Sequence, residues 1–233
     1  KGKAVNKLEL LAKENQLLHT KAHDALSDVE ALIALTKLLK EKQGKLFDYL
    51  LTMRSKNEVA KLVNLESPKP FVYASGRYGA EHDFTTVAFP LTPGTKPGSV
   101  LVYDLRYDPS SFVCATPQAL ASVLFADRDV RAQEGFVPLP VKELSYNKCP
   151  AVAPLGVFDE ASQQRLKLPL EDIQANLTRL TANKPFAEAV RTAFEMREPY
   201  APSTDVESQL YDSFMPDKDK VKCAAMRSAA GND

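Results

Sequence analysis

The stretch Ser99-Val100-Leu101-Val102-Tyr103-Asp104-Leu105 indicates a β-strand more clearly than any other part of the sequence. Branched and aromatic residues dominate it, and these residue types favour the pleated backbone of a sheet. The preceding segment, Pro90 to Gly98, contains three prolines and predicts a loop. Phe71 to Ala74 and Thr85 to Phe89 predict two further strands, and Val137 to Val141 predicts another extended segment. Short strands separated by loops rich in proline and glycine are typical of a small, mostly antiparallel β module.

Helical patterns lie on both sides of this module in the sequence. Apolar residues recur at helical spacing in the flanking segments, and proline or glycine interrupts them. The predicted helices are 5–18, 25–42, 46–63, 116–125 and 166–196, of which 46–63 is one helix or a helix pair and 166–196 has a break at 168–170; 205–214 opens a last helix pair. The sequence therefore predicts an α+β fold, in which a β module is combined with helical additions.

Charge and cysteine content limit the function classes. The 233 residues carry 30 Lys and Arg against 30 Asp and Glu, so a surface for nucleic acid must be local. No apolar run reaches about 18 residues, and we expect no membrane span. Cys114, Cys149 and Cys223 form no Cys-x-x-Cys motif, which favours a reducing cytoplasm over a disulfide framework or a zinc site. We expect Cys149, before Pro150, to be buried, and the chain to be a fragment of a longer protein.

The segment from His23 to Asp28 gathers side chains that bind metals or transfer protons. Asp24 is a good helix N-cap, which places Asp28 about one turn inside the helix and His23 on the loop before it. A helical carboxylate near a loop imidazole can serve as a Mg²⁺ ligand and a general base. On these residues alone, a capping aspartate beside an ordinary loop histidine is the more common alternative.

The spacing His-x-x-x-x-Asp of His23 and Asp28 resembles the third exonuclease motif of the DEDDh 3′–5′ exonuclease superfamily. Lys-Leu-Phe-Asp-Tyr-Leu at 45–50 and Asn-Lys-Cys-Pro at 147–150 resemble the bacterial exodeoxyribonuclease I family more narrowly. The resemblance runs from about Lys7 to the end of the chain. It implies three parts: 1–43, the C-terminal part of an RNase H-like exonuclease domain; 44–197, an SH3-like DNA-binding domain; and 198–233, the truncated start of a helical domain.

The resemblance also implies an activity. It implies a Mg²⁺-dependent exodeoxyribonuclease that degrades single-stranded DNA from 3′ to 5′, releases nucleoside 5′-monophosphates and serves DNA repair and recombination. In the family, four carboxylates hold two Mg²⁺ ions while a histidine activates the attacking water. Asp28 takes one metal position and His23 the catalytic position. The other carboxylates have no match here, so we expect this chain alone to be inactive or nearly so.

Six residues are candidates for contact with DNA: Lys7, Lys56, Lys69, Lys142, Asn147 and Lys148. Lys69 stands between two prolines that pre-set its backbone, so it would lose little order on binding phosphate. Lys142, Asn147 and Lys148 flank Tyr146, and cations beside an aromatic ring suit a single-strand groove. Taken alone, each lysine is more often a solvated surface charge, and the helix after Lys7 also carries acidic residues.

Tyr49 matches a tyrosine that, in the family, helps to form a pocket for the C-terminal tail of single-stranded-DNA-binding protein. That tail is acidic with an apolar end, so its pocket needs basic and apolar walls. Pro154 and Asp159 stand where basic or polar pocket residues would be expected, and Asp159 would repel an acidic peptide. The alternative for Tyr49 is an amphipathic core residue with its hydroxyl at the surface.

A second function class stays open. The chain could be a non-catalytic module that binds single-stranded DNA or docks a partner, using Lys56, Lys69, Lys142 and Lys148. Composition does not separate this module from the enzyme. In either case we expect a monomer.

Overall fold

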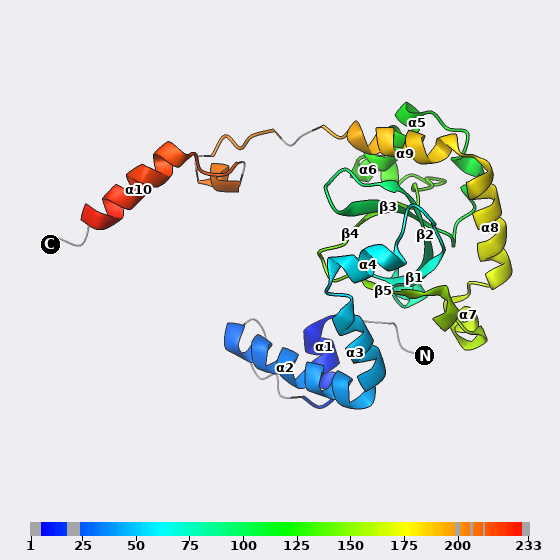
Figure 1. Ribbon diagram of the computed structural model, residues 1–233, viewed down its shortest axis with the longest axis horizontal. Helices are drawn as coiled ribbons and strands as arrows, with labels where there is room; N and C mark the ends of the chain where they lie inside the picture. Colours follow the sequence, from blue (N-terminus) through cyan, green and yellow to red (C-terminus); the bar gives the residue numbers. More distant parts are fainter. Residues whose placement is uncertain (1–5, 18–23, 199–200, 206, 212, 230–233) are drawn as a thin grey trace. The chain divides into compact units, whose positions relative to one another are not determined.

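The computed structural model describes residues 6–17, 24–198, 201–205, 207–211 and 213–229 (Figure 1). Contacts divide the chain into two compact units, Lys1–Met196 and Arg197–Asp233. None of the helices in the described ranges is both long enough and apolar enough to cross a membrane.

Antiparallel strands form one five-stranded sheet in the order β4-β3-β2-β1-β5. The strands are β1 (Phe71–Ala74), β2 (Thr85–Pro93), β3 (Ser99–Asp104), β4 (Val141–Ser145) and β5 (Ala151–Pro154). The predicted strands at 71–74, 85–89 and 99–105 are confirmed, as is the antiparallel arrangement. The extended segment predicted at 137–141 was placed too early: Pro138 and Pro140 have no N–H to donate to a neighbouring strand, and the ladder begins only at Val141.

The sheet separates two hydrophobic cores, which explains why β3 is buried along its whole length. Leu101 and Tyr103 belong to the first core, while Val100 and Val102 belong to the second, as the two-residue period of a strand requires. The helices α5 (Pro117–Leu124), α8 (Leu170–Ala182) and α9 (Pro185–Glu195) supply the first core. Helix α4 (Lys56–Leu62) supplies the second core through Val59 and lies on another side of the sheet from α9 in Figure 1.

The helices before the sheet are α1 (Leu8–Glu14), α2 (Ala25–Lys42) and α3 (Gly44–Thr52). Asp24 caps α2 as predicted, because its Oδ2 accepts a 3.1 Å hydrogen bond from the backbone N–H of Ser27. Helix α2 buries Ala31 and Leu35 but leaves Leu32 55% exposed. Apolar side chains of α2 are therefore not all covered by the described residues.

The remaining helices are short or stand in the second unit. The first unit also contains α6 (Arg128–Arg131) and α7 (Glu160–Leu166), and the second contains α10 (Asp217–Ala229). Within 205–214, where the sequence predicts the opening of a helix pair, the described residues form a 3₁₀ turn, Ser208–Tyr211. The prediction that Cys149 is buried was wrong: it is exposed and has a φ of 46°, because the chain turns sharply between β4 and β5 there.

Candidate nucleic-acid interface

Of the two residues of the exonuclease-like motif, the structure describes one. His23 lies outside the described residues, and Asp28 lies half-buried in the first turn of α2. Across the described ranges, no group of three or more His, Cys, Asp or Glu residues could hold a metal ion. Because Mg²⁺ takes six oxygen ligands in a near-octahedral arrangement, the single carboxylate of Asp28 does not by itself make a magnesium site.

Lys142 lines a cavity of about 220 Å³, called here the Lys142 pocket, together with Arg77, Tyr78, His82, Asp104 and Arg106. Its Nζ lies 3.7 Å from the centre of the Tyr78 ring and donates a hydrogen bond to the carbonyl oxygen of Arg77. Burial lowers the pKa of Lys142, and the nearby charge of Asp104 opposes that shift. The ammonium is thus held by a ring face, a carbonyl and a negative charge.

Asp104 is the buried acid of the Lys142 pocket, with only 5% of its surface exposed. Its Oδ1 accepts hydrogen bonds from the Thr86 hydroxyl and, at 3.1 Å, from the Arg106 backbone N–H. Burial raises the pKa of Asp104, while those two hydrogen bonds and the charges of Arg106 and Lys142 oppose the rise. The Arg106 guanidinium itself donates to the carbonyls of Leu166, at 2.8 Å, and Thr85, at 3.2 Å. Much of the polar capacity of this pocket is therefore taken up within the fold.

His82 lines the same pocket, and the sequence predicted no role for it. Its Nε2 lies 3.9 Å from Glu81 Oε1, and its Nδ1 is buried without a hydrogen-bond partner among the described residues. Burial lowers the pKa of His82, and the charge of Arg106 adds to the effect. The imidazole is accordingly neutral near pH 7 and adds no positive charge to the pocket.

Lys148 lines a different cavity, of about 370 Å³, called here the Lys148 pocket. Arg77 and Lys96 line it as well, together with the hydroxyl-bearing Ser75 and Ser145 and the acidic Glu143. Arg77 comes from the turn after β1, Lys96 from the β2–β3 loop and Lys148 from the β4–β5 turn. Sequence reasoning missed Arg77 and Lys96, although a lysine at the tip of a proline-rich hairpin loop was a usable signal.

Lys69 lines a third cavity, of about 450 Å³, with Lys61, Leu62, Asn64, Pro154 and Leu155 among its neighbours; we call it the Lys69 pocket. Asp159 is not part of its lining. Instead, Asp159 caps α7 by accepting a 2.8 Å hydrogen bond from the Ser162 backbone N–H, and hydrogen bonding from Ser162 lowers its pKa.

Tyr49 lies on α3 and is half-buried. Its hydroxyl donates a 3.1 Å hydrogen bond to the carbonyl oxygen of Val152 on β5. Burial raises the pKa of this phenol. Tyr49 therefore supports the strand that leads to Pro154 in the Lys69 pocket.

The other predicted DNA contacts are scattered. Lys7 precedes α1, Lys56 begins α4 and Asn147 follows β4, and all of them are exposed. Tyr146 packs against the second core, and its hydroxyl donates a 3.1 Å hydrogen bond to the carbonyl oxygen of Val63. The structure thus divides Lys142 and Lys148 between two pockets that share Arg77, rather than gathering them around Tyr146.

Known proteins resemble this chain over nearly its whole length. Exodeoxyribonuclease I of Haemophilus influenzae is 34% identical over 223 residues, which cover 95% of this chain and 47% of that protein. The crystal structure of E. coli exonuclease I in complex with a dA16 oligonucleotide has a TM-score of 0.85 at 33% identity, covering 100% of this chain and 49% of that one. An ExoI/SSB-Ct complex has a TM-score of 0.79 at 31% identity, covering 97% of this chain and 46% of that one.

The chain therefore spans about half the length of the relatives that it matches. The family model described as the exonuclease I SH3-like domain matches residues 54–196, which include the whole sheet and the three pockets. Since this match covers more than half of the 233 residues, the chain belongs to the exonuclease I SH3-like domain family.

Proposed function

We propose that this chain is part of a Mg²⁺-dependent exodeoxyribonuclease that degrades single-stranded DNA from 3′ to 5′ and releases nucleoside 5′-monophosphates. Family membership supports this assignment, as does the likeness to an exonuclease I structure that holds an oligonucleotide. The proposed role of the sheet module is to hold the strand, and the proposed process is DNA repair and recombination.

One observation carries the proposal: cations gather locally on a chain whose net charge is zero. Lys69, Lys142 and Lys148 each line a pocket, and Arg77 lines two of them. Phosphates of a single strand attract such cations, and binding releases counterions from the strand. A local basic surface of this kind binds DNA without making the whole protein basic.

The proposed metal centre involves two Mg²⁺ ions, with Asp28 as a ligand and His23 as the general base. Asp28 is half-buried on a helix, which fixes its backbone, but the described residues do not complete a site around it. For the 233-residue chain alone, we accordingly propose binding of single-stranded DNA without digestion.

The proposed partner is the C-terminal tail of single-stranded-DNA-binding protein. The Lys69 pocket offers the cations Lys61 and Lys69 and the apolar Leu62 and Leu155, which complement an acidic tail with an apolar end. Asp159, which would repel such a tail, lies outside the pocket lining and is engaged at the start of α7. The ExoI/SSB-Ct complex among the similar structures supports this proposal.

The test is to incubate the 233-residue chain with a 5′-labelled oligothymidylate and Mg²⁺, and to follow binding and chain length together. We expect salt-sensitive binding and an intact oligonucleotide. Clear digestion that His23→Ala abolishes would contradict the proposed absence of activity in this chain. A lack of any binding would contradict the proposed DNA-binding role.

The second candidate is a non-catalytic module that binds single-stranded DNA or docks a partner. The three cationic pockets favour it, because they need no catalytic residue to function. The same assay, carried out on the protein purified from its native source, distinguishes the two candidates. Mg²⁺-dependent release of nucleotides from a 3′ end supports the enzyme, whereas binding without release supports the module.

A further inference from the structure

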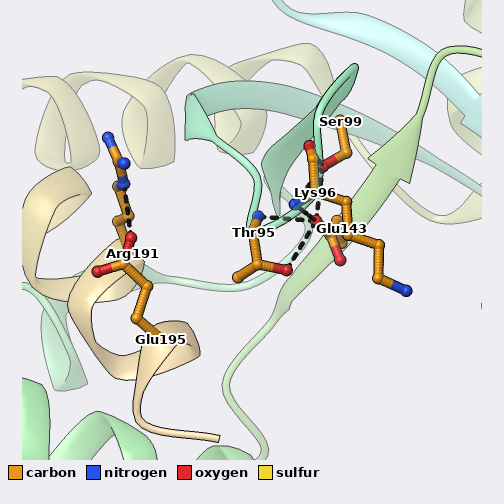
Figure 2. Close-up of polar contacts among 6 residues, drawn as sticks. All are labelled: Thr95, Lys96, Ser99, Glu143, Arg191 and Glu195. Atoms are coloured by element: carbon orange, nitrogen blue, oxygen red, sulfur yellow. Dashed lines mark hydrogen bonds and ion pairs between the residues drawn. The ribbon is translucent and has the colours of Figure 1, made fainter. Parts of the chain in front are cut away.

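Glu143, on β4, binds the loop that joins β2 to β3 (Figure 2). Its Oε1 accepts hydrogen bonds from the backbone N–H groups of Thr95, at 2.8 Å, and Lys96, at 3.2 Å. The hydroxyls of Ser99, at 2.6 Å, and Thr95, at 3.1 Å, approach the same oxygen. In Figure 2 these groups surround the carboxylate, whereas the Lys96 side chain extends away from it.

The carboxylate of Glu143 is charged when it makes these contacts. Burial by itself would raise the pKa of Glu143, but the hydrogen bonds from Ser99, Lys96 and Thr95 outweigh it and hold the pKa below its ordinary value. Hydrogen bonds to an ionised acceptor are stronger than those between neutral groups. The loop is therefore tied to β4 by a charged acceptor.

The loop backbone is adapted to this contact. A Cβ atom on Gly94 would collide with Ser99 Oγ and Glu143 Oε1, so glycine allows the close approach. Gly98 has a φ of 73°, which is in the left-handed region that favours glycine, and it completes the turn into β3. The loop conformation that carries Lys96 thus depends on the Glu143 contact and on both glycines.

From this loop Lys96 lines the Lys148 pocket, as do Arg77 and Lys148. Each of these cations comes from a different turn, and side chains on separate turns converge only if the turns themselves are fixed. Ser75 and Ser145 add hydroxyl groups, and Glu143 is the one acid among the described residues of the lining. The loop occupies Oε1 of Glu143, and its one negative charge is outnumbered by Arg77, Lys96 and Lys148, so the pocket keeps an excess of positive charge that suits an anion such as a phosphate.

We propose that Arg77, Lys96 and Lys148 form a subsite for one phosphodiester group of a single strand, and that Glu143 is the positioning residue that holds Lys96 in it. The proposal rests on the proposed function. The proposal predicts the direction in which DNA affinity changes when Glu143 is removed. If Glu143 acted only as a negative charge beside a phosphate, its removal would strengthen DNA binding, whereas removal of a positioning residue weakens it.

The test measures binding of a fluorescent oligothymidylate to the 233-residue chain across a range of salt concentrations. Lys96→Ala should weaken binding about three- to ten-fold and make the plot of log K against log salt shallower by about 0.7, the value for one phosphate contact with a single strand. Glu143→Ala should weaken binding by a similar factor. The double variant should bind no more weakly than Lys96→Ala alone, because Glu143 acts through Lys96.

Two further variants sharpen the result. Glu143→Gln keeps an acceptor oxygen for the loop, so we expect it to bind within about two-fold of wild type. Glu134→Ala removes an exposed glutamate that lines neither the Lys142 nor the Lys148 pocket and should leave binding unchanged. Circular dichroism checks the folding of each variant. If Glu143→Ala does not fold, the salt slopes of Lys96→Ala and Arg77→Ala decide whether the subsite exists, and Glu143→Gln tests the positioning role.

The outcomes that overturn the proposal are distinct from failure of the proposed function. The positioning role would be excluded if folded Glu143→Ala bound DNA as tightly as wild type or more tightly. It would also be excluded if the loss of affinity in the double variant equalled the product of the two single losses. Unchanged salt slopes in Lys96→Ala and Arg77→Ala, with wild-type chain still binding, would exclude the subsite alone. No binding by the wild-type chain would instead refute the proposed DNA-binding function.

Discussion

The hydroxyl of Tyr49 donates a 3.1 Å hydrogen bond to the carbonyl oxygen of Val152, which lies 103 residues further along the chain. This contact joins α3 to β5, the strand at one end of the sheet order. Val152 is buried in the second core, and Tyr49 packs against the same core. The contact therefore connects the helices before the sheet to the module that carries the three pockets.

Removing this hydroxyl should destabilise the fold. We expect Tyr49→Phe to lower the free energy of unfolding by about 1 kcal/mol, because a partly buried carbonyl loses its donor while the ring still packs. Urea denaturation followed by circular dichroism measures the change. Tyr107→Phe, at an exposed tyrosine, serves as the matched control and should change the free energy by less. Equal effects of the two substitutions would contradict a stabilising role for the Tyr49 contact.

The cap of α2 gives a local prediction. Asp24→Ala removes the acceptor for the Ser27 N–H and should cost about 1 kcal/mol of helix stability. Hydrogen exchange of the amides in the first turns of α2 is the direct measurement, and they should exchange faster by about five-fold, as that free energy implies. Asp48→Ala, at an exposed residue inside α3, controls for the loss of a charge. Unchanged exchange in Asp24→Ala would mean that the cap contributes nothing to α2.

The sequence predicted the strands whose residues alone favour a sheet, and it missed those that depend on their neighbours. Phe71–Ala74 and Ser99–Asp104 were found because branched and aromatic residues fill them. Val141–Ser145 holds Lys142 and Glu143 in its middle, and both are half-buried because each has partners on other elements. The short strand Ala151–Pro154 exists through its pairing with β1, which no local pattern reveals.

The candidate site shows the same division between local and long-range information. Lys142 and Lys148 were named from a local motif, and the structure gives each a pocket. Arg77 and Lys96 come from other turns, and only the folded sheet brings them to those pockets. Glu143 contacts a loop that lies far from it in the sequence: Ser99, at the end of that loop, is 44 residues before Glu143. Sequence spacing therefore could not predict this contact.

Because Asp104 is a buried acid, we expect the free energy of unfolding to depend on pH. Burial raises its pKa in the folded protein above the unfolded value of about 3.9. The Asp104 carboxyl therefore stays protonated to a higher pH in the folded state than in the unfolded state. Its contribution to the free energy of unfolding is complete below about pH 4 and is lost as pH rises through its pKa in the folded protein. We expect the stability of wild type relative to Asp104→Asn to fall as pH rises from about 4, measured by urea denaturation at each pH.

Asp108 is the matched control for this measurement. Hydrogen bonds from Ser110 lower its pKa, so its contribution is present above the unfolded pKa and is lost as pH falls. The stability of wild type relative to Asp108→Asn should therefore rise with pH over the acid range. A wild-type advantage over Asp104→Asn that also rises with pH would contradict the raised pKa of Asp104.

The most direct test of the central claim, that local cations on the sheet module bind a single strand, is the salt dependence of oligothymidylate binding. For the 233-residue chain, log K should fall linearly with log salt, and Lys142→Ala with Lys148→Ala should make that line shallower by about 1.4 and weaken binding. Lys37→Ala with Lys45→Ala removes two exposed lysines outside the pockets and should leave the line nearly unchanged. If the Lys142 and Lys148 variant binds with the affinity and slope of wild type, the proposed strand-binding surface is wrong.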